Sequence, residues 1–145
     1  MFGKININFF SMSNCIFCKI VAGEIPCHKV YEDENVLAFL DIHPCAKGHT
    51  VVIPKKHVDN IEAIETVSWH NLTTGLKKTI DKILAVIKPA GLNVGFNNNP
   101  VAGQAVPHLH WHIFPRYEGD GGGSMHSIIK NPGDTKVEDI AKLFL

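Results

Sequence analysis

The stretch "HLHWHIFPR", residues 108–116, places three histidines at alternate positions. Successive side chains of a β-strand point to opposite faces of a sheet, so His108, His110 and His112 are expected to share one face. The apolar residues between them then fall on the opposite face. Three adjacent imidazoles make a poor hydrophobic core and an unusual surface, and imidazole titrates near neutral pH and binds metals. The pattern therefore indicates a chemical role for this strand.

Alternating apolar residues predict four more strands around the histidine strand, which is expected over residues 106–115. Two strands are predicted within residues 28–42, on either side of the turn "EDEN". A third is predicted over residues 48–57, stopped by Pro54, and a fourth over residues 91–97. The short connections between neighbouring strands favour an antiparallel sheet.

One long segment has the spacing of an amphipathic helix, which Pro89 and Gly91 end. Its apolar face is expected to comprise Trp69, Leu72, Leu76, Ile80, Ile83, Leu84 and Ile87. A shorter helix is predicted within "CIFCKIVAGE", residues 15–24. The resulting β-β-β-α-β-β order predicts an α+β domain, in which the long helix packs on one face of the five-stranded sheet.

The charge balance excludes partners that bind by whole-chain electrostatics. The chain of 145 residues has 14 basic and 14 acidic side chains, so no attraction to nucleic acid or to a membrane surface is expected. Lys4, Asn6 and Asn8 interrupt the apolar N-terminal stretch, which is therefore not a convincing signal peptide. We expect a cytoplasmic protein whose four cysteines are thiols or metal ligands rather than disulfides.

Two chemistries compete for the histidine strand. Three histidines around one zinc ion with an open position would make a zinc hydrolase or lyase. However, the strand follows "AGQAVP", a glycine-containing loop whose backbone N–H groups could cradle an anion. His49 and His57 come from a second strand. Imidazoles and backbone donors, together with Asn97, favour a phosphate ester over a carbonyl substrate.

The histidine stretch resembles His-φ-His-φ-His-φ-φ, where φ is apolar, the signature of the histidine triad (HIT) family of nucleotide hydrolases and transferases. Other stretches resemble landmarks of its Hint-like and bacterial Hit branch, in the same order: "CIFCKIVAGEIP", "VYEDENVLAFLDI", "KGHTVVIPKKH", "GLNVGFNNN", "AGQAVPH" and "IFPRY". The resemblance covers residues 14–118. It implies a HIT domain that is a five-stranded antiparallel half-barrel and pairs with a second copy as a homodimer.

The resemblance implies catalytic roles for three histidines. His110 would attack phosphorus and form a covalent nucleotidyl-imidazole intermediate, which water then hydrolyses. A neutral imidazole can do this without first losing a proton, and a backbone carbonyl of the motif strand would hold its tautomer. His112 would donate a hydrogen bond to a phosphate oxygen. His49 would lie beside His110 and help to hold the site.

The resemblance also implies a phosphate-binding loop. Asn97 and the backbone from Gly103 to Ala105 would bind the phosphate, with Gln104 as a further binding residue or as a support for the loop. Preorganised donors of this kind stabilise charge on phosphoryl oxygens. Hint-like proteins usually carry serine at the position of Ala105, where the hydroxyl assists the leaving group. Expulsion of an amine is therefore expected to be slow in this chain.

The nucleoside pocket is implied by residues near the N-terminus. Asp41 would accept hydrogen bonds from ribose hydroxyls, while Phe17, Ile25, Phe39 and Ile42 would enclose the base. Considered without the resemblance, those four apolar residues are ordinary core. Few polar groups could distinguish one base from another, so a purine nucleotide is the expected substrate.

Cys15 and Cys18 form C-x-x-C, which is half of a structural zinc site. The resemblance implies that His57 and His108 complete it as a closed Cys2His2 centre, separate from catalysis. A redox pair or an unligated thiol pair is the alternative, although the context of a thioredoxin-like redox motif is missing.

Two segments flank the predicted domain. Residues 1–13 are expected to be a disordered N-terminal extension, and residues 119–145 a glycine-rich segment and C-terminal tail. Within the tail, "TKVEDIAKLFL" predicts either a closing helix or a mobile end. The leading interpretation is a purine nucleotide hydrolase or nucleotidyl transferase, and its substrates would be phosphoesters, phosphoramidates or dinucleoside polyphosphates. The alternative is a nucleotide-binding regulatory or interaction protein with weak hydrolysis.

Overall fold

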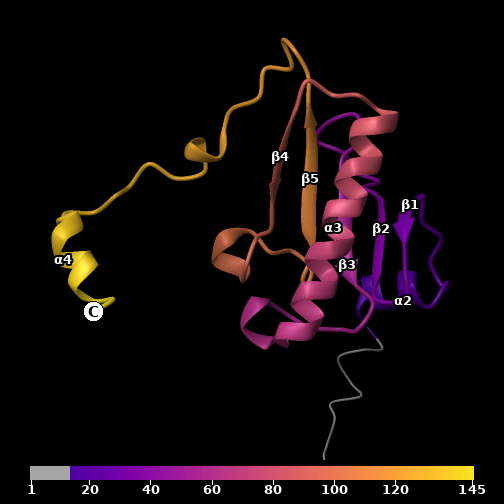
Figure 1. The fold of residues 1–145 in the computed structure, drawn as a ribbon, viewed down its shortest axis with the longest axis horizontal. Helices are drawn as coiled ribbons and strands as arrows, with labels where there is room; N and C mark the ends of the chain where they lie inside the picture. Colours follow the sequence, from indigo (N-terminus) through magenta and orange to yellow (C-terminus); the bar gives the residue numbers. More distant parts are fainter. Residues whose placement is uncertain (1–13) are drawn as a thin grey trace, which may run out of the picture.

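The computed structural model describes residues 14–145, so the extension predicted over residues 1–13 lies outside the described residues. Five strands form one sheet in the order β1-β2-β3-β5-β4, and every neighbouring pair is antiparallel (Figure 1). Their bounds are β1 Lys29–Glu32, β2 Val36–Leu40, β3 Thr50–Pro54, β4 Gly91–Gly95 and β5 Trp111–Arg116. The predicted α+β fold with a five-stranded antiparallel sheet is confirmed.

The long helix α3, Thr66–Val86, packs on one face of this sheet (Figure 1). Gly75 brings it close to β2, because a Cβ atom there would lie 2.8 Å from the side chain of Val36. Close approach explains a glycine inside a helix, where it would otherwise be destabilising. The prediction that Leu84 belongs to the buried face is wrong: it is 43% exposed. The neighbouring Ile83 occupies the core, and one residue further along turns a helical side chain by about 100°.

The other face of the sheet is also covered. The short helix α2, Ile16–Val21, carries Phe17 onto Leu37 and Phe39 of β2. Residues 36–39 are consequently buried on both sides of the sheet. The helix α2 thus covers part of the sheet face that the histidines share.

The histidine strand begins later than predicted, at Trp111 instead of residue 106. Pairing between β3 and β5 ends at Val52 opposite Trp111, and beyond this point the backbone N–H of Leu109 donates to Val58 O at 2.8 Å. Residues 108–110 are therefore held by the segment that follows β3 and not by the ladder. The predicted alternation nevertheless continues, because Leu109 and Ile113 are buried in the core beneath α3.

Residues 118–145 are exposed. Met125 still lies beside β4, because a Cβ atom at Gly95 would be 3.0 Å from its Cε, and the chain beyond it runs away from the sheet (Figure 1). They contain a short turn of 3-10 helix, η3 Met125–Ser127, and the helix α4, Val137–Lys142. The closing helix predicted near the C-terminus therefore forms, and Figure 1 shows it separate from the domain. Among the described helices, none combines the length and the apolar character needed to cross a bilayer.

Candidate functional site

Four predicted ligands converge beside α2. Cys15 and Cys18 come from the start of this helix, His57 from the segment after β3, and His108 from the segment before β5. Their ligand atoms all lie within 4.8 Å of one another. The Sγ–Nδ1 distances are 3.4 Å for Cys15–His108, 3.2 Å for Cys18–His57 and 3.7 Å for Cys18–His108. Zinc bond lengths predict an S–N separation of ~3.6 Å in a tetrahedral site, so the cluster could hold one such ion.

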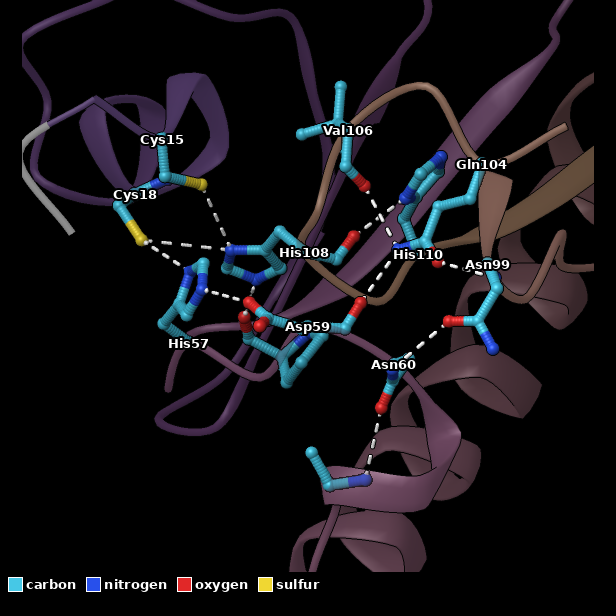
Figure 2. A network of polar contacts seen from close by, with 12 residues as sticks. Cys15, Cys18, His57, Asp59, Asn60, Asn99, Gln104, Val106, His108 and His110 are labelled. Atoms are coloured by element: carbon cyan, nitrogen blue, oxygen red, sulfur yellow. Dashed lines mark hydrogen bonds and ion pairs between the residues drawn. The ribbon is translucent and has the colours of Figure 1, made fainter. Parts of the chain in front are cut away.

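The outer nitrogens of both histidines are already fixed (Figure 2). His57 Nε2 lies 2.8 Å from Asp59 Oδ1, and His108 Nε2 lies 2.8 Å from Pro54 O. A carboxylate and a carbonyl only accept hydrogen bonds, so each Nε2 carries the proton and donates it. The lone pair of each Nδ1 then points toward the sulfurs. A hydrogen-bond acceptor on the outer nitrogen orients a metal-binding histidine in this way.

The thiol of Cys18 needs a compensating charge to ionise. Burial, together with the neighbouring Cys15, raises the pKa of this thiol to about 12. A bound cation would favour the thiolate instead. All four cysteines, which lie within the described residues, are free of disulfides, as predicted.

A second cluster comprises His49, Asp41 and His112. The backbone N–H of Cys45 donates to His49 Nδ1 at 3.2 Å, so in the neutral ring the proton lies on Nε2. His49 Nε2 lies 2.9 Å from His112 Nδ1 and donates to it, which leaves the proton of His112 on its Nε2. Asp41 Oδ2 lies 3.7 Å from His49 Nε2. His112 therefore offers an N–H donor on the side away from His49.

His110 has the opposite polarity. Its Nδ1 lies 2.7 Å from the backbone oxygen of His108, which can only accept, so the proton is on Nδ1 and Nε2 keeps a free lone pair. Burial lowers the pKa of His110, and His49 is shifted in the same direction for the same reason. Burial lowers the pKa of His112 to about 4, with His110 and His49 contributing. All three rings are neutral at pH 7.

Aromatic rings hold these imidazoles in place. Phe17 meets the ring of His110 edge to face, with centroids 5.1 Å apart. Phe114 stacks on His112 at 5.6 Å and lies 4.3 Å from the ring of His49. The sequence analysis did not assign Phe114 to the site. The signal was available, because Phe114 continues the alternation that begins at His108.

A groove of about 1040 Å³ opens beside the histidines. Volumes of this size accommodate small-molecule ligands. The predicted residues along it are Phe17, Ile25, Phe39, Asp41, Ile42, His49, Asn97, Gly103, Ala105, His110 and His112. Sequence reasoning missed residues from β5 and the tail that also line it, including Arg116, Asp120 and Met125. Arg116 binds Asp120 through Nε and Nη2 at 2.7 and 2.8 Å, which fixes the start of the tail beside the groove.

Gln104 and Ile42 differ from the other predicted nucleotide-binding residues. The Gln104 side chain does not line the groove but donates to Asp59 O at 2.6 Å and to Val106 O at 3.0 Å. It therefore supports the loop, which was one of its two predicted roles. Ile42 lines the groove but is 74% exposed, so it belongs to the rim.

The three histidines do not converge on one metal ion. The Nδ1 of His108 faces the sulfurs and its Nε2 binds Pro54 O, whereas His110 and His112 face the groove. A single three-histidine zinc centre is therefore incompatible with these ring orientations. The ligand atoms of Asp41, His49 and His112 do lie within 4.8 Å of one another, so a second group of metal-ligating side chains lies inside the groove.

Comparison with known proteins gives consistent matches. The model of the HIT domain family matches residues 22–119. Protein hit of Bacillus subtilis is 47% identical over 131 residues, which are 90% of this chain and 89% of that protein. The adenosine 5'-monophosphoramidase hnt1 of Schizosaccharomyces pombe is 44% identical over 103 residues, 71% of this chain and 74% of that protein. The crystal structure of a HIT family protein from Bacillus anthracis has a TM-score of 0.79 at 44% identity, covering 90% and 92% of the two chains.

Proposed function

This chain belongs to the HIT domain family, and from that membership we propose that it hydrolyses or transfers purine nucleotides through a covalent intermediate on His110. The observation that carries the proposal is the hydrogen bond of 2.7 Å between His110 Nδ1 and His108 O. It leaves the Nε2 lone pair of a neutral, buried imidazole free at the groove. The name of the fission yeast relative, an adenosine 5'-monophosphoramidase, supports the same substrate class.

The proposed reaction has two steps. The lone pair of His110 Nε2 attacks phosphorus, so a P–N bond forms while the bond from phosphorus to the leaving group breaks, and the leaving group departs with the electron pair. Water then attacks phosphorus, the P–N bond breaks, and a nucleoside monophosphate is released. The enzyme would act as a transferase where another nucleophile replaces this water. Splitting one displacement into two easier ones is the advantage of a covalent intermediate.

Other residues of the groove would stabilise the phosphate. The Nε2–H of His112 is free to donate to a phosphoryl oxygen, because its Nδ1 accepts from His49. The Asn97 side chain and the loop from Gly103 to Ala105 would supply further donors. Asp41 would accept from the ribose hydroxyls. Groups fixed in this way before substrate binds lower the barrier because they need no reorganisation.

The base would lie between Phe17, Ile25, Phe39 and Ile42, which are among the apolar side chains that line the groove. Ala105 offers no hydroxyl to a departing amine. We therefore expect dinucleoside polyphosphates, whose leaving phosphate is acidic, to react faster than phosphoramidates.

A trapping experiment tests the intermediate. The protein is mixed with a dinucleoside polyphosphate labelled at the α-phosphate, quenched within the first turnover and digested. We expect acid-labile label on the peptide that contains His110 and none in the His110→Ala variant. The alternative function, a nucleotide-binding regulatory protein with weak hydrolysis, is favoured by Ala105 and predicts tight nucleotide binding without label.

We further propose that the Cys15, Cys18, His57 and His108 cluster holds a structural zinc ion. The chemistry of the donor set and the S–N distances support this assignment. With all four positions taken by protein ligands, the ion would contribute to folding and not to the reaction. The ion would join the start of α2 to the segment after β3 and to the segment before β5.

The proposal includes a homodimer, as family resemblance implies. Among the strands of residues 14–145, β1 and β4 are the two edges of the sheet, and an edge strand can pair with another chain. Light scattering coupled to size-exclusion chromatography should give twice the 16.0 kDa mass of the chain.

A further inference from the structure

The loop between β4 and β5 contains a strained residue. Asn99 has φ 70° and ψ 158°, a backbone conformation that only glycine adopts readily. It immediately precedes the short 3-10 helix η2, Pro100–Ala102, between the predicted phosphate contacts at Asn97 and Gly103. Strained residues persist only where surrounding contacts hold them, and they concentrate at ligand-binding sites.

Three hydrogen bonds hold Asn99 in this conformation. Its Oδ1 accepts from Asn60 Nδ2 at 3.1 Å, and its Nδ2 donates to Glu62 Oε1 at 3.2 Å. Its backbone N–H donates to Gln104 Oε1 at 2.8 Å. The side chain of Asn99 thus has a partner at each polar atom, and all three partners lie outside the groove.

The partners of Asn99 are themselves connected. Glu62 uses its second oxygen to accept from Asn98 Nδ2 at 2.9 Å, and this bond lowers the pKa of its carboxyl. Asn98 Oδ1 accepts from the backbone N–H of Ile61 at 2.9 Å. Asn60 caps the 3-10 helix η1, Ile61–Ala63, through a bond of 3.2 Å to the N–H of Ala63.

A further hydrogen bond links the other end of the loop to the segment after β3. Gln104 Nε2 donates to Asp59 O at 2.6 Å, so the loop is tied to the segment after β3 on both sides of η2 (Figure 2). Asp59 also accepts from the ring of His57, one of the four metal ligands. We call Asn60, Glu62, Asn98, Asn99 and Gln104 the loop clasp.

We propose that Asn99 is a positioning residue and that the loop clasp fixes the anion-binding loop before a ligand arrives. None of the clasp residues lines the groove, so they act through their neighbours Asn97, Gly103 and Ala105, which do. A loop that is ordered in advance loses no conformational freedom on binding. Its hydrogen-bond donors already point to the position of the anion. The inference rests on the proposed function for the identity of the anion, a nucleotide phosphate.

Two variants test the loop clasp by different routes. Asn99→Gly removes the clasp contacts of the side chain but tolerates the backbone conformation, so the fold is expected to survive. Glu62→Gln keeps the shape of the side chain but turns an N–H group toward one of the two asparagine amides. Glu65→Gln is the matched control, because Glu65 is exposed and, among the described residues, pairs with Lys56 alone, at 3.5 Å.

Hydrogen exchange and steady-state kinetics are measured for each variant. We expect faster exchange of the amides of residues 99–105 in both clasp variants, with β3 and β5 unchanged. The KM for a dinucleoside polyphosphate should rise about tenfold, the value of one lost hydrogen bond, while kcat stays within about threefold. Glu65→Gln should match the wild type in both measurements.

Three results would overturn the inference: wild-type exchange in both clasp variants, faster exchange with an unchanged KM, or an equal change in Glu65→Gln. Failure of the proposed function is distinguished by a separate measurement. That function would be refuted if the wild-type protein neither binds adenosine monophosphate nor hydrolyses the dinucleoside polyphosphate. The hydrogen-exchange data would still decide whether the loop clasp orders the loop.

Discussion

His108 and His110 lie two residues apart on the same face of one strand segment, yet their environments differ completely. Both ring nitrogens of His108 have partners, the sulfurs on one side and Pro54 O on the other. His110 has one nitrogen bound and the other free at the groove. The difference arises from the covering residues, because the sulfurs of Cys15 and Cys18 face a ring nitrogen of His108, whereas Phe17 of α2 meets the ring of His110 edge to face and offers it no polar partner. Strand periodicity selects a face, and the neighbouring elements decide the chemistry of each position.

The largest expected effect separates the two histidines by function. His110→Ala removes the Nε2 lone pair and should lower turnover by a factor on the order of 10⁴ or more, as loss of a catalytic nucleophile does. Its metal content should remain that of the wild type. In His108→Ala the metal content should fall, and this loss should be larger than the change in turnover. Turnover within tenfold of the wild type in His110→Ala would remove the proposed contrast between the two positions.

Metal removal comes next in size and concerns the His108 side of the comparison. At a zinc concentration 1,000 times its Kd, binding stabilises the folded state by about 4 kcal/mol. We expect the free energy of unfolding in urea to fall by this amount after chelation or in Cys18→Ser. Elemental analysis should give one zinc per chain. Cys45→Ser is the control, because Cys45 is exposed and is not one of the four clustered ligands. An unfolding midpoint that is insensitive to chelation would contradict a structural metal.

A smaller effect on the free energy of unfolding is expected from pH, through the groove residue His112. His112 has a pKa of about 4 in the folded chain against 6.5 in the unfolded chain. Between these values the unfolded state binds more protons, so the free energy of unfolding should fall as pH decreases from about 6.5 to about 4. Urea unfolding of zinc-loaded protein at pH 7 and pH 5 measures this change. His112→Gln should reduce the slope, and an unchanged slope in that variant would assign the effect to other groups.

The smallest expected effect concerns the leaving group. Ala105→Ser restores the hydroxyl that Hint-like relatives usually carry, and it should raise turnover of an adenosine phosphoramidate about tenfold, the value of one hydrogen bond in the transition state. A dinucleoside polyphosphate serves as the internal control, because its leaving phosphate needs no proton. Metal content should not change. Equal acceleration of both substrates would indicate a general change in the loop instead.

The sequence predicted the five antiparallel strands and the long helix, because their periodicity and short connections are local signals. The Cys15–Cys18 spacing with the family resemblance brought His57 and His108 into one predicted centre. The hydrogen bond of His49 to His112 was not predicted, because His49 was expected beside His110. Periodicity failed where residues leave the regular ladder. The start of β5 was misplaced because Leu109 pairs with Val58, and this contact depends on how two distant segments meet.

Other features had no local signal. The side chain of Gln104 is directed by carbonyl groups of Asp59 and Val106, and the strain at Asn99 is visible only in its backbone angles. Met125 lines the groove from the tail, where Arg116 also contacts Asp120 and the backbone oxygen of Gly123. Such contacts between separate loops are set by tertiary structure, which a single sequence does not encode in its spacing.

Residue 108 has two separate roles, one for its side chain and one for its backbone oxygen. Its imidazole belongs to the metal cluster, but the oxygen that holds the proton on His110 belongs to its main chain. Every amino acid carries that oxygen, so the second role places no demand on the side chain. Divergence could therefore discard the cysteine pair and the imidazole together, and a chain rebuilt in this way would retain the proton arrangement of its nucleophile.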